Sequence, residues 1–499
     1  MHSQTPGLAC GFDSEFLSKH MPKLPNSRDS LQFFGLSKRV KTDERYPPRN
    51  TEIRYGPTSG TAFSVAHTPS NWKRGLLKRC AHQFHPHDVS MRSAFFGFVR
   101  EELKNYPVLS VVSFEELQEE WLSNANYNLE RKSHLRKCAD EYFNSQVSPR
   151  EMNSIKSFIK AEFYTELKEP RIINSRSDYF KAVVGPYIHY AEKYVYDDHF
   201  IKHLRPSQVV DRLNGLHKHG CIYYGTDYSS FEGSFDPELQ RHVERALWDK
   251  LFANYPRVLS LIQSAYGTNH VFYRKKYHAS FKGSRMSGDM WTSLANGFTN
   301  LMAAKFMSKV SQADTRILVE GDDGFIASNR ELDLSVLTKL GFKITKEVST
   351  EPSDIEFCSL RVCKNTLIPD ITRTLTHYGF IVDPALAHNL ENGSKRAFKR
   401  LGDIYMSKAM SLLATSAGVP ILQSLALQQM RVWSGHHLRS EYCDWWERNF
   451  FDLSNPVARP IDDEVREYVA QRFDIPVARQ IEIERALETC TDRCFTFEL

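Results

Sequence analysis

The chain has 499 residues, of which 41% are hydrophobic and 25% are charged, a composition typical of a globular protein. Its formal net charge of +5 fits a nucleic-acid partner without requiring one. The nine cysteines show no Cys-x-x-Cys spacing, so a disulfide scaffold is not expected and a reducing compartment is favoured. Because there is no run of about 18 apolar residues and no signal-peptide pattern, we expect no transmembrane helix.

Along the chain, the pattern changes several times. Residues 1–60 are polar and irregular and predict an extension that lies over other parts of the protein. Apolar and charged residues at helical spacing predict helices within 61–150. Residues 151–226 mix helix and strand and carry many cations, and apolar strands alternate with helices over 222–363. Beyond about residue 364 the pattern is mostly helical.

A carboxylate stands at the end of a predicted strand in CIYYGTDYSSFEGSFD. Residues 221–224 read as a buried strand, with Asp227 just past its end and Glu232 five positions later. Pro237 is suited to the first position of the helix that follows. Taken alone, Asp227 is equally compatible with a turn or a helix cap. A second acidic element elsewhere in the chain raises the odds of a shared site.

A flexible Gly/Ser loop leads into a predicted helix in GSRMSGDMWTSLANGFTNLM, residues 283–302. Thr292 and Asn296 are four positions apart and therefore share one helix face. This polar pair is compatible with a satisfied core pair or with a capping feature. Its position between two acidic elements favours a role in reading a sugar.

The second acidic element is ILVEGDDGFIAS, residues 317–328, which predicts two strands joined by a tight turn. Gly321 suits such a turn because glycine tolerates positive φ. Asp322 and Asp323 then lie side by side, where they repel each other unless a cation neutralises them. Oxygen-rich sites of this kind bind Mg²⁺ or Mn²⁺. Gly-Asp-Asp is also ordinary turn composition, so the motif gains its weight from its neighbours.

The order of these elements resembles motifs A, B, C and E of viral RNA-dependent RNA polymerases: Asp227, the SGxxxTxxxN helix, GDD, and IEFCSL at 355–360. RMSGDMWTSLANG and IEFCS are similar to the tombusvirus-type polymerases of positive-strand RNA viruses. EPRIINSRSDYFKAVVGPYIHYAEKYVY, residues 169–196, is similar to motif F of that family. The resemblance runs from about residue 168 to 363, with weaker support beyond.

The resemblance implies an α+β right-hand fold, with fingers, a palm built on an antiparallel sheet flanked by helices, and a mostly helical thumb. On this basis we expect six segments. They are an N-terminal extension (1–60), fingers (61–221, with motif F at 168–196), a first part of the palm (222–239), a fingers insertion (240–281), a second part of the palm (282–363), and the thumb with the C-terminal region (364–499).

The resemblance also implies a reaction, the replication of a viral RNA genome by template-directed transfer of ribonucleoside triphosphates with release of pyrophosphate. Asp227, Asp322 and Asp323 would bind two Mg²⁺ ions, with Mn²⁺ as a substitute. Two-metal sites hold their ions roughly 3.5–4 Å apart and stabilise the attacking and leaving oxygens. A lysine in KLGFKITKE would protonate the pyrophosphate, and Lys343 and Lys346 both qualify.

Substrate contacts follow from the same motifs. Asn296, with Ser287 or Thr292, would read the ribose 2′-hydroxyl, which distinguishes RNA precursors from DNA precursors. Glu232 departs from the commonest pattern, in which many relatives have Asp, and its extra methylene moves the carboxylate by roughly 1.5 Å. Cations near motif F would line the nucleotide channel, where Arg forks suit phosphate oxygens, although a solvated basic face is the alternative. These are Lys168, Arg171 and Arg176 for the substrate and Lys160 and Lys181 for RNA.

In the C-terminal third, four cations form a ridge at helical spacing: Lys395, Arg396, Lys399 and Arg400. A solvated helix face and a contact with RNA phosphates are about equally compatible with this ridge. The partners implied are a single-stranded RNA template, the product RNA and ribonucleoside triphosphates. We expect activity in the host cytoplasm, with attachment to replication membranes through a viral or host partner as an open alternative.

Two other functions are compatible with parts of this pattern. A reverse transcriptase usually has an aromatic residue before its paired aspartates, whereas Gly321 stands there in this chain, and Asn296 favours a ribose. A non-catalytic scaffold that binds RNA is the rival from another class, and the intact Asp227, Asp322 and Asp323 argue against it. RNA synthesis is the reading that the residues favour.

Overall fold

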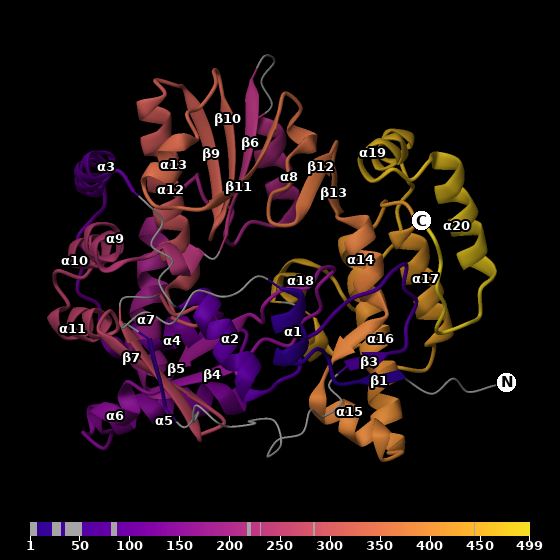
Figure 1. Ribbon diagram of the computed structural model, residues 1–499, viewed down its shortest axis with the longest axis horizontal. Coiled ribbons are helices and arrows are strands. Elements are labelled where there is room, and N and C mark those ends of the chain that lie inside the picture. The colour runs from indigo at the N-terminus through magenta and orange to yellow at the C-terminus, as the bar shows by residue number, and fades with distance from the viewer. Residues whose placement is uncertain are drawn as a thin grey trace.

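A computed structural model of the chain describes residues 7–21, 31–34, 52–80, 87–216, 221–229, 231–282, 285–443 and 445–499. Figure 1 shows a four-stranded sheet at the top, a five-stranded sheet at the lower left and a mostly helical part on the right. Separate helices and largely antiparallel sheets confirm the expected α+β class. Much of the expected extension 1–60 lies outside the described residues.

The four-stranded sheet carries the acidic motifs. Its strands, in spatial order, are β11 (Ile344–Ser349), β6 (Ile222–Tyr228), β10 (Asp323–Ser328) and β9 (Thr315–Glu320). All neighbouring pairs are antiparallel. We expected the first strand to end before Asp227, and this was wrong. The strand continues to Tyr228 because the edge strand pairs with its far end, with Ile344 opposite Tyr228.

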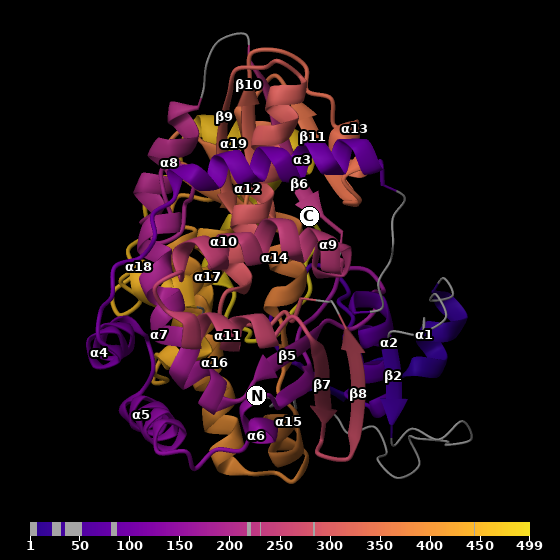
Figure 2. The same ribbon diagram turned by 90° about the vertical axis from the view of Figure 1, so that its left-hand side faces the viewer.

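Both faces of this sheet are covered. Side chains alternate along each strand, so Tyr224 and Ile326 join a core with α12 (Thr292–Val310). Tyr223 and Phe325 point the other way and pack with α8 (Pro206–Gly215). The helix α12 is buried along most of its length. Figure 2 shows α3 (Val89–Glu102) crossing in front of α12 and the sheet. Asp227 shares the Tyr223 face.

The five-stranded sheet draws on distant segments. Its spatial order is β2 (Leu31–Phe34), β8 (Tyr277–Lys282), β7 (Thr268–Tyr273), β4 (Ile155–Ile159) and β5 (Ile172–Arg176). The pair of β4 and β7 is parallel, whereas the other pairs are antiparallel. The helix α2 (Pro69–Arg79) packs on this sheet, with Trp72 stacked on Tyr273 at 5.3 Å between ring centroids.

The loop before α12, which packs on the four-stranded sheet, closely approaches the backbone of the five-stranded sheet. Gly288, in the loop before α12, forms a β-bridge with Ser175 on β5. A Cβ at position 288 would lie 2.5 Å from Asn174 O, so the approach requires glycine. The N-terminal end of α12 is therefore held against the five-stranded sheet.

Helices surround these sheets. Within the region 61–150, where helices were predicted, residues 113–143 form two helices, because Asn128 caps a new start with its side chain accepting from Arg131 N at 2.8 Å. The helices before and between the sheets are α4 (Phe114–Asn124), α5 (Leu129–Phe143), α6 (Pro149–Met152), α7 (Asp178–Val195), α9 (Pro237–Leu239), α10 (Arg245–Leu251), α11 (Pro256–Ser264) and α13 (Ser335–Lys339). Short turns of 3₁₀-helix are η1 (Leu103–Asn105), η2 (Phe231–Ser234) and η4 (Pro352–Asp354), and a π-helix, η3, spans Gln240–Glu244. Pro237 stands at a helix start, as predicted.

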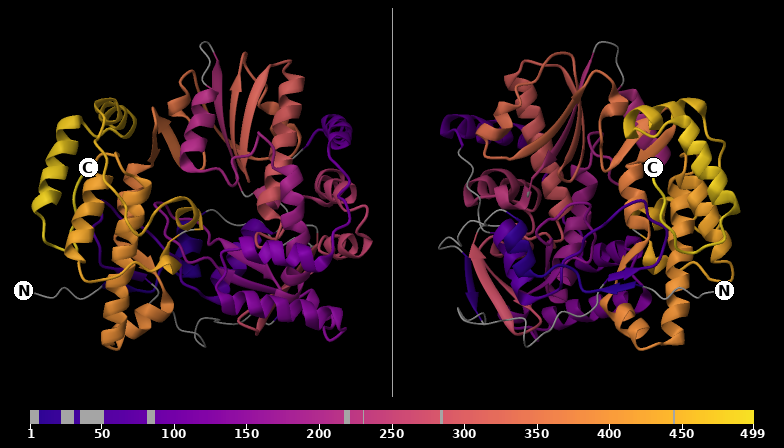
Figure 3. Two further views of the ribbon diagram at one scale, coloured as in Figure 1. Left: turned by 180° about the vertical axis from the view of Figure 1, so that it is seen from behind. Right: turned by 45° about the vertical axis from the view of Figure 1, so that its right-hand side comes forward.

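The C-terminal part has its own apolar core. Its elements are β12 (Leu360–Cys363), β13 (Thr366–Pro369), α14 (Ile371–Tyr378), β14 (Phe380–Val382), α15 (Pro384–Glu391), α16 (Lys395–Thr415), α17 (Leu422–Val432), η5 (Ser440–Tyr442), α18 (Trp445–Phe450), α19 (Asp463–Phe473) and α20 (Val477–Thr489). The long helices α16 and α17 run together in the rear view of Figure 3. The predicted helical character of this third is confirmed.

Segments from the start of the chain pack on this C-terminal part. The strands β1 (Gly7–Ala9), β3 (Glu52–Arg54) and β14 form a three-stranded sheet. The helix α1 (Ser14–His20) follows β1. Further on, Phe63 pairs with Tyr164, so the same segment reaches the loop between β4 and β5. The N-terminal residues thus connect the C-terminal helices with the five-stranded sheet.

The cysteines and the described helices bear on the expected absence of disulfides and of a transmembrane helix. The nine cysteines, all within the described residues, form no disulfide bond in the structure. Among the described helices, none combines the length and apolar character needed to cross a membrane.

Candidate active site

The three acidic residues meet where β6 and β10 run side by side. Thr226 on β6 pairs with Gly324 on β10, so the adjoining Asp227 and Asp323 are neighbours at the same end of the sheet. Asp322 lies in the turn between β9 and β10. Gly321 has a φ of +58° in this turn, which confirms the predicted need for glycine.

The buried helix α12 lies behind the turn and holds it in place. Asn300 donates through its side-chain amide to Gly321 O at 3.3 Å and to Asp323 O at 3.0 Å. Its Oδ1 accepts a bond of 3.2 Å from the Tyr228 hydroxyl on β6. A Cβ at Gly324 would overlap Thr226 Oγ1, so the close approach of β6 and β10 depends on this glycine.

A second set of contacts anchors the strand that enters the turn. Lys202 Nζ lies 2.8 Å from Glu320 Oε1 at the end of β9. Ser293, in the first turn of α12, donates to the same carboxylate oxygen at 3.2 Å. The turn is therefore fastened on both sides, and the acidic pair at its tip is presented in a defined position.

The carboxylates disfavour each other's charge. Burial, with Glu232 and Asp227 nearby, raises the pKa of Asp322 to about 6. Burial, with Asp322 and Asp227 nearby, raises the pKa of Asp323 to about 7. Burial also raises the pKa of Asp227, while Lys168 and Arg171 act in the opposite direction. The cluster thus carries excess negative charge that an added cation would relieve.

The donor chemistry of this cluster fits a divalent cation. Among the residues that the structure describes, no three His, Cys, Asp or Glu side chains lie close enough to hold an ion by themselves. Mg²⁺ is usually bound through one or two carboxylates together with waters and substrate phosphates. Asp227, Asp322 and Asp323 are hard oxygen donors of that kind, and burial, together with neighbouring carboxylates, raises the pKa of each.

Two cations face the carboxylates from the loop between β4 and β5. The Lys168 and Arg171 side chains are exposed, and both lower the pKa of Asp227. Arg171 Nη1 lies 3.5 Å from Glu162, and Lys160 Nζ lies 2.9 Å from the same carboxylate. Arg79, at the end of α2, reaches Glu232 at 3.6 Å. This edge of the site offers positive groups suited to phosphate oxygens.

The loop before α12 uses its own polar groups. Ser287 donates to Ile172 O on β5 at 2.8 Å. The Thr292 hydroxyl donates to Met286 O at 3.0 Å and to Asp289 O at 2.9 Å, which closes the loop onto the helix start. Asn296 is buried, and its Oδ1 accepts a bond from Arg285.

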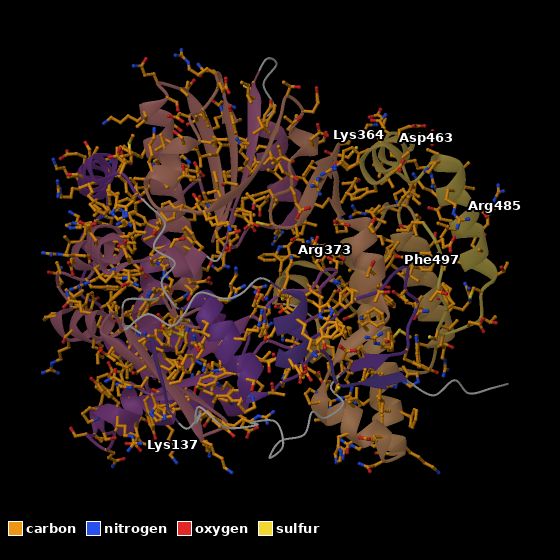
Figure 4. All side chains as sticks on the ribbon, in the orientation of Figure 1. Lys137, Lys364, Arg373, Asp463, Arg485 and Phe497 are labelled. Carbon is orange, nitrogen blue, oxygen red and sulfur yellow. The ribbon has the colours of Figure 1, made fainter. Side chains whose placement is uncertain are left out.

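A cavity of about 470 Å³ lies beside the hairpin. Its walls include Glu320 at the end of β9, Cys358 next to Asp323, and Arg373 on α14. Figure 4 shows Arg373 on the side of α14 that looks toward the middle of the molecule. Its guanidinium lies 3.8 Å from Glu356. The cavity therefore reaches the hairpin at Glu320, next to the acidic turn.

Comparison with known families decides the identity of this fold. A family model described as "Viral RNA dependent RNA polymerase" matches residues 125–491. The chain belongs to the viral RNA-dependent RNA polymerases. The match includes the four-stranded sheet, the loop with Lys168 and Arg171, and most of the C-terminal helices.

Individual relatives agree with this family. The RNA-directed RNA polymerase of Pariacoto virus is 29% identical over 234 residues, which cover 42% of this chain and 23% of the viral protein. That of Panicum mosaic virus (strain United States/Kansas 109S) is 26% identical over 314 residues, or 54% and 29% of the two chains. The genome polyprotein of human hepatitis A virus is 27% identical over 151 residues, or 28% and 7%. The matched parts span less than a third of each relative, and the resemblance drawn from the motifs is confirmed.

Several expected polymerase residues lie away from the acidic turn. Arg176 is buried in an ion pair with Asp289 and also donates to Asn269 Oδ1 at 3.2 Å. Lys181 donates to Ser175 Oγ at 2.6 Å. In this structure the guanidinium of Arg176 is enclosed by protein groups rather than turned toward a channel.

The two lysine candidates lie on opposite faces of the sheet. Thr345 on β11 is paired with Asp227, and Lys346 with Thr226. Because faces alternate along a strand, Lys346 points to the face opposite Asp227. Lys343, whose carbonyl accepts a bond from Ser229 N at 2.9 Å, falls on the Asp227 face by the same alternation.

The four cations on α16 differ in their exposure and contacts. Lys395, Arg396 and Lys399 are exposed, whereas Arg400 is tied to Asp383 at 2.9 Å and to the Tyr442 hydroxyl at 2.7 Å. Arg400 therefore belongs to the packing of the C-terminal part.

Sequence reasoning missed the residues that support the turn. These are Lys202, Ser293 and Asn300. Arg285 was also missed, and it contacts Asn296 rather than the turn. Asn300 had a detectable signal, because it follows Asn296 by four positions and continues the same polar face. The sequence contained no such signal for Lys202 and Arg285, because their partners Glu320 and Glu244 lie in distant segments of the chain.

Proposed function

We propose that this chain copies single-stranded RNA into RNA from ribonucleoside triphosphates, as the catalytic part of a viral polymerase in the host cytoplasm. The observation that carries this proposal is the pairing of Thr226 with Gly324, which makes Asp227 a neighbour of the Asp322–Asp323 turn. Lys168 and Arg171 face this cluster, and both lower the pKa of Asp227. Template RNA, product RNA and the triphosphates are the partners that this function requires.

We assign the four-stranded sheet to a palm, the five-stranded sheet to fingers and residues 364–499 to a thumb. Strand β6 comes from 222–239 and strands β9, β10 and β11 come from 282–363, yet they share one sheet, as two parts of a palm would. Strands β7 and β8, from the proposed fingers insertion, pair within the sheet that contains β4 and β5. This sharing supports the proposed boundaries.

In the proposed reaction, the primer 3′-oxygen forms a bond to the α-phosphorus while the bond to the pyrophosphate oxygen breaks. Asp227, Asp322 and Asp323 would hold two divalent ions, with Mg²⁺ preferred and Mn²⁺ as a substitute. Bound ions of this kind supply Lewis-acid stabilisation of the attacking and leaving oxygens. Because the protein forms no covalent bond, its residues act by positioning and charge compensation.

The remaining roles follow from position. Lys168 and Arg171 would hold the triphosphate with charge-assisted hydrogen bonds. Asn296 and Glu232 would contact the ribose, with Ser287 and Thr292 shaping the loop beside it. Lys343, on the Asp227 face, is the preferred proton donor to the departing pyrophosphate.

The test is primer extension on an RNA template with the purified chain, with and without Mg²⁺ or Mn²⁺. Asp322→Asn and Asp227→Asn should each lower ribonucleotide addition by at least about a hundredfold, as loss of a preorganised charged group does. RNA binding by fluorescence anisotropy should stay close to that of the unaltered chain.

A matched control lies on the same hairpin. Asp314 precedes β9 at the end remote from the turn and is exposed, so Asp314→Asn should leave the rate unchanged. Normal synthesis by Asp322→Asn would contradict the metal assignment. Preferred addition of deoxyribonucleotides would instead point to a reverse transcriptase.

A further inference from the structure

An ion pair is buried behind the start of α12. The Arg285 side chain is 1% exposed and that of Glu244 is 0% exposed, with Nη2 2.5 Å from Oε2. Glu244 ends the π-helix that follows the Asp227 motif. Removing two charges from water costs about as much as their attraction returns, so a buried ion pair is weak evidence for stability. The complete burial of this pair therefore points to a role other than stability.

Arg285 is held on two further sides. The centre of its guanidinium lies 3.9 Å from the centroid of the Phe235 ring. Its Nη1 donates to Asn296 Oδ1. A guanidinium is planar, permanently charged and able only to donate. Between Glu244 and Phe235 it is therefore a rigid donor with one orientation toward Asn296.

This contact decides which way the Asn296 amide points. The two ends of an amide have nearly the same shape, but one is an acceptor and the other a donor. Because Arg285 occupies Oδ1, the Nδ2 donor of Asn296 is directed away from it. Ser293 and Asn300, three positions before and four after on the same helix, contact Glu320 and the acidic turn. Asn296 shares their face of α12.

A hydroxyl has one proton and two acceptor positions. If a ribose hydroxyl gives its proton to the Glu232 carboxylate, its second protein partner must be an N–H group. An amide with Nδ2 directed to the sugar supplies that group, whereas a flipped amide would present a second acceptor.

We propose that Arg285 is a positioning residue for sugar selection, which locks the Asn296 amide with its donor toward the ribose 2′-hydroxyl. Glu244 and Phe235 hold Arg285 in turn. This inference rests on the proposed function, in which Asn296 contacts the ribose of the incoming nucleotide.

The experiment compares ATP with 2′-dATP, both in single-nucleotide addition and in equilibrium binding by calorimetry. Arg285→Met should lower the preference for ATP by about tenfold, the factor that one neutral hydrogen bond is worth, chiefly through the KM for ATP. Arg285→Lys keeps a charge beside Glu244 but lacks the planar fork. Its preference for ATP should therefore lie between that of the unaltered chain and that of Arg285→Met.

Arg285→Met leaves Glu244 buried without its partner, and the chain could unfold for that reason alone. The double variant Arg285→Met with Glu244→Leu removes both charges and should keep the thermal unfolding temperature close to normal. It should show the same loss of preference. A folded double variant with normal preference for ATP overturns the inference.

A double-mutant cycle of Arg285 and Asn296 distinguishes a positioning role of Arg285 from a general structural effect. In an Asn296→Ala background, Arg285→Met should cause no further loss of preference. Independent, additive losses overturn the inference. As a matched control, Arg466 and Glu484 form a partly buried pair at 2.8 Å in the C-terminal part, and Arg466→Met with Glu484→Leu should not change the preference.

Failure of the proposed function gives a different result. If Asn296→Ala itself has normal preference, or the unaltered chain adds no ribonucleotide, the assigned role of Asn296 is wrong. If Asn296→Ala loses preference and the Arg285 variants do not, the polymerase assignment stands and the positioning role falls.

Discussion

The side-chain amide of Asn300 donates a hydrogen bond of 3.0 Å to the backbone carbonyl of Asp323. The same amide reaches Gly321 O at 3.3 Å, on the other side of the acidic turn. A two-residue turn has few contacts of its own, so its position depends on the helix behind it. The long buried helix α12 therefore acts as the support from which the acidic pair is presented.

Asn300→Ala should slow nucleotide addition while leaving the protein folded. The substitution leaves two turn carbonyls and the Tyr228 hydroxyl without their partner, which costs about 1–3 kcal/mol of stability. We expect kcat to fall more than KM rises, because the turn loses its position. Single-turnover addition and urea unfolding measure the two effects.

Asn254 provides the comparison. Its amide donates to Leu109 O at 3.0 Å, away from the acidic turn. Asn254→Ala should lose less stability, because this side chain is exposed and makes one such bond, and it should keep a normal rate. A normal rate in Asn300→Ala would mean that the turn holds its position unaided.

Lys343→Ala should lower the rate of addition by about a hundredfold, the usual contribution of a general acid. Lys346→Ala should have little effect, because its side chain points to the face opposite Asp227. The measurement is the rate of a single addition over a range of pH. The reverse order of effects would contradict the assignment by strand alternation.

RNA affinity should fall steeply as salt concentration rises, since each phosphate contact releases counterions. Lys395→Gln with Lys399→Gln should lower the slope of log affinity against log salt by about 0.7 for each contact removed. Lys137, labelled in Figure 4, is exposed on α5 and serves as control. An unchanged slope in the double variant would make the α16 ridge a solvated face.

Stability should decline in mild acid through His67. Burial, with Arg274 nearby, lowers the pKa of His67 from 6.5 to about 4. Between these values the unfolded chain binds more protons than the folded chain. The contribution of the neutral His67 to the free energy of unfolding is therefore fully present above about pH 6.5 and is lost as the pH falls toward 4.

Urea unfolding at pH 7 and pH 5 tests this expectation. His67→Gln should flatten the difference between the two midpoints, and the exposed His388→Gln should leave it as in the unaltered chain. If His67→Gln and the unaltered chain show the same difference in midpoint between pH 7 and pH 5, the His67 imidazole is not the cause of the acid sensitivity.

Local pattern predicted the elements that carry the site. Alternating apolar residues around Gly321 located both strands of the hairpin, and Pro237 marked a helix start. The sequence predicted a strand at 221–224 with Asp227 just past its end, but pairing with β11 extends the strand to Tyr228. Such an extension depends on a partner more than a hundred residues away, which the local sequence does not contain.

The same limit explains Arg176 and the five-stranded sheet. A cation near a phosphate-binding motif suggests a channel, yet Arg176 turns inward because Asp289 lies behind β5. The parallel pairing of β4 with β7 leaves no trace in either strand alone. One-dimensional periodicity identifies a strand and its faces, but not its neighbours.

The sheet of β1, β3 and β14 has a consequence for how the chain is made. Next to this sheet, the Thr58 hydroxyl donates to the carbonyl of Thr376, which lies 318 residues further along, so this contact cannot form until residue 376 has left the ribosome. At about 5–20 residues per second, that wait lasts on the order of 15–60 s. During this time the early strands present unpaired edges, which invite misassociation with other nascent chains. The topology therefore predicts that chaperones bind this chain during translation.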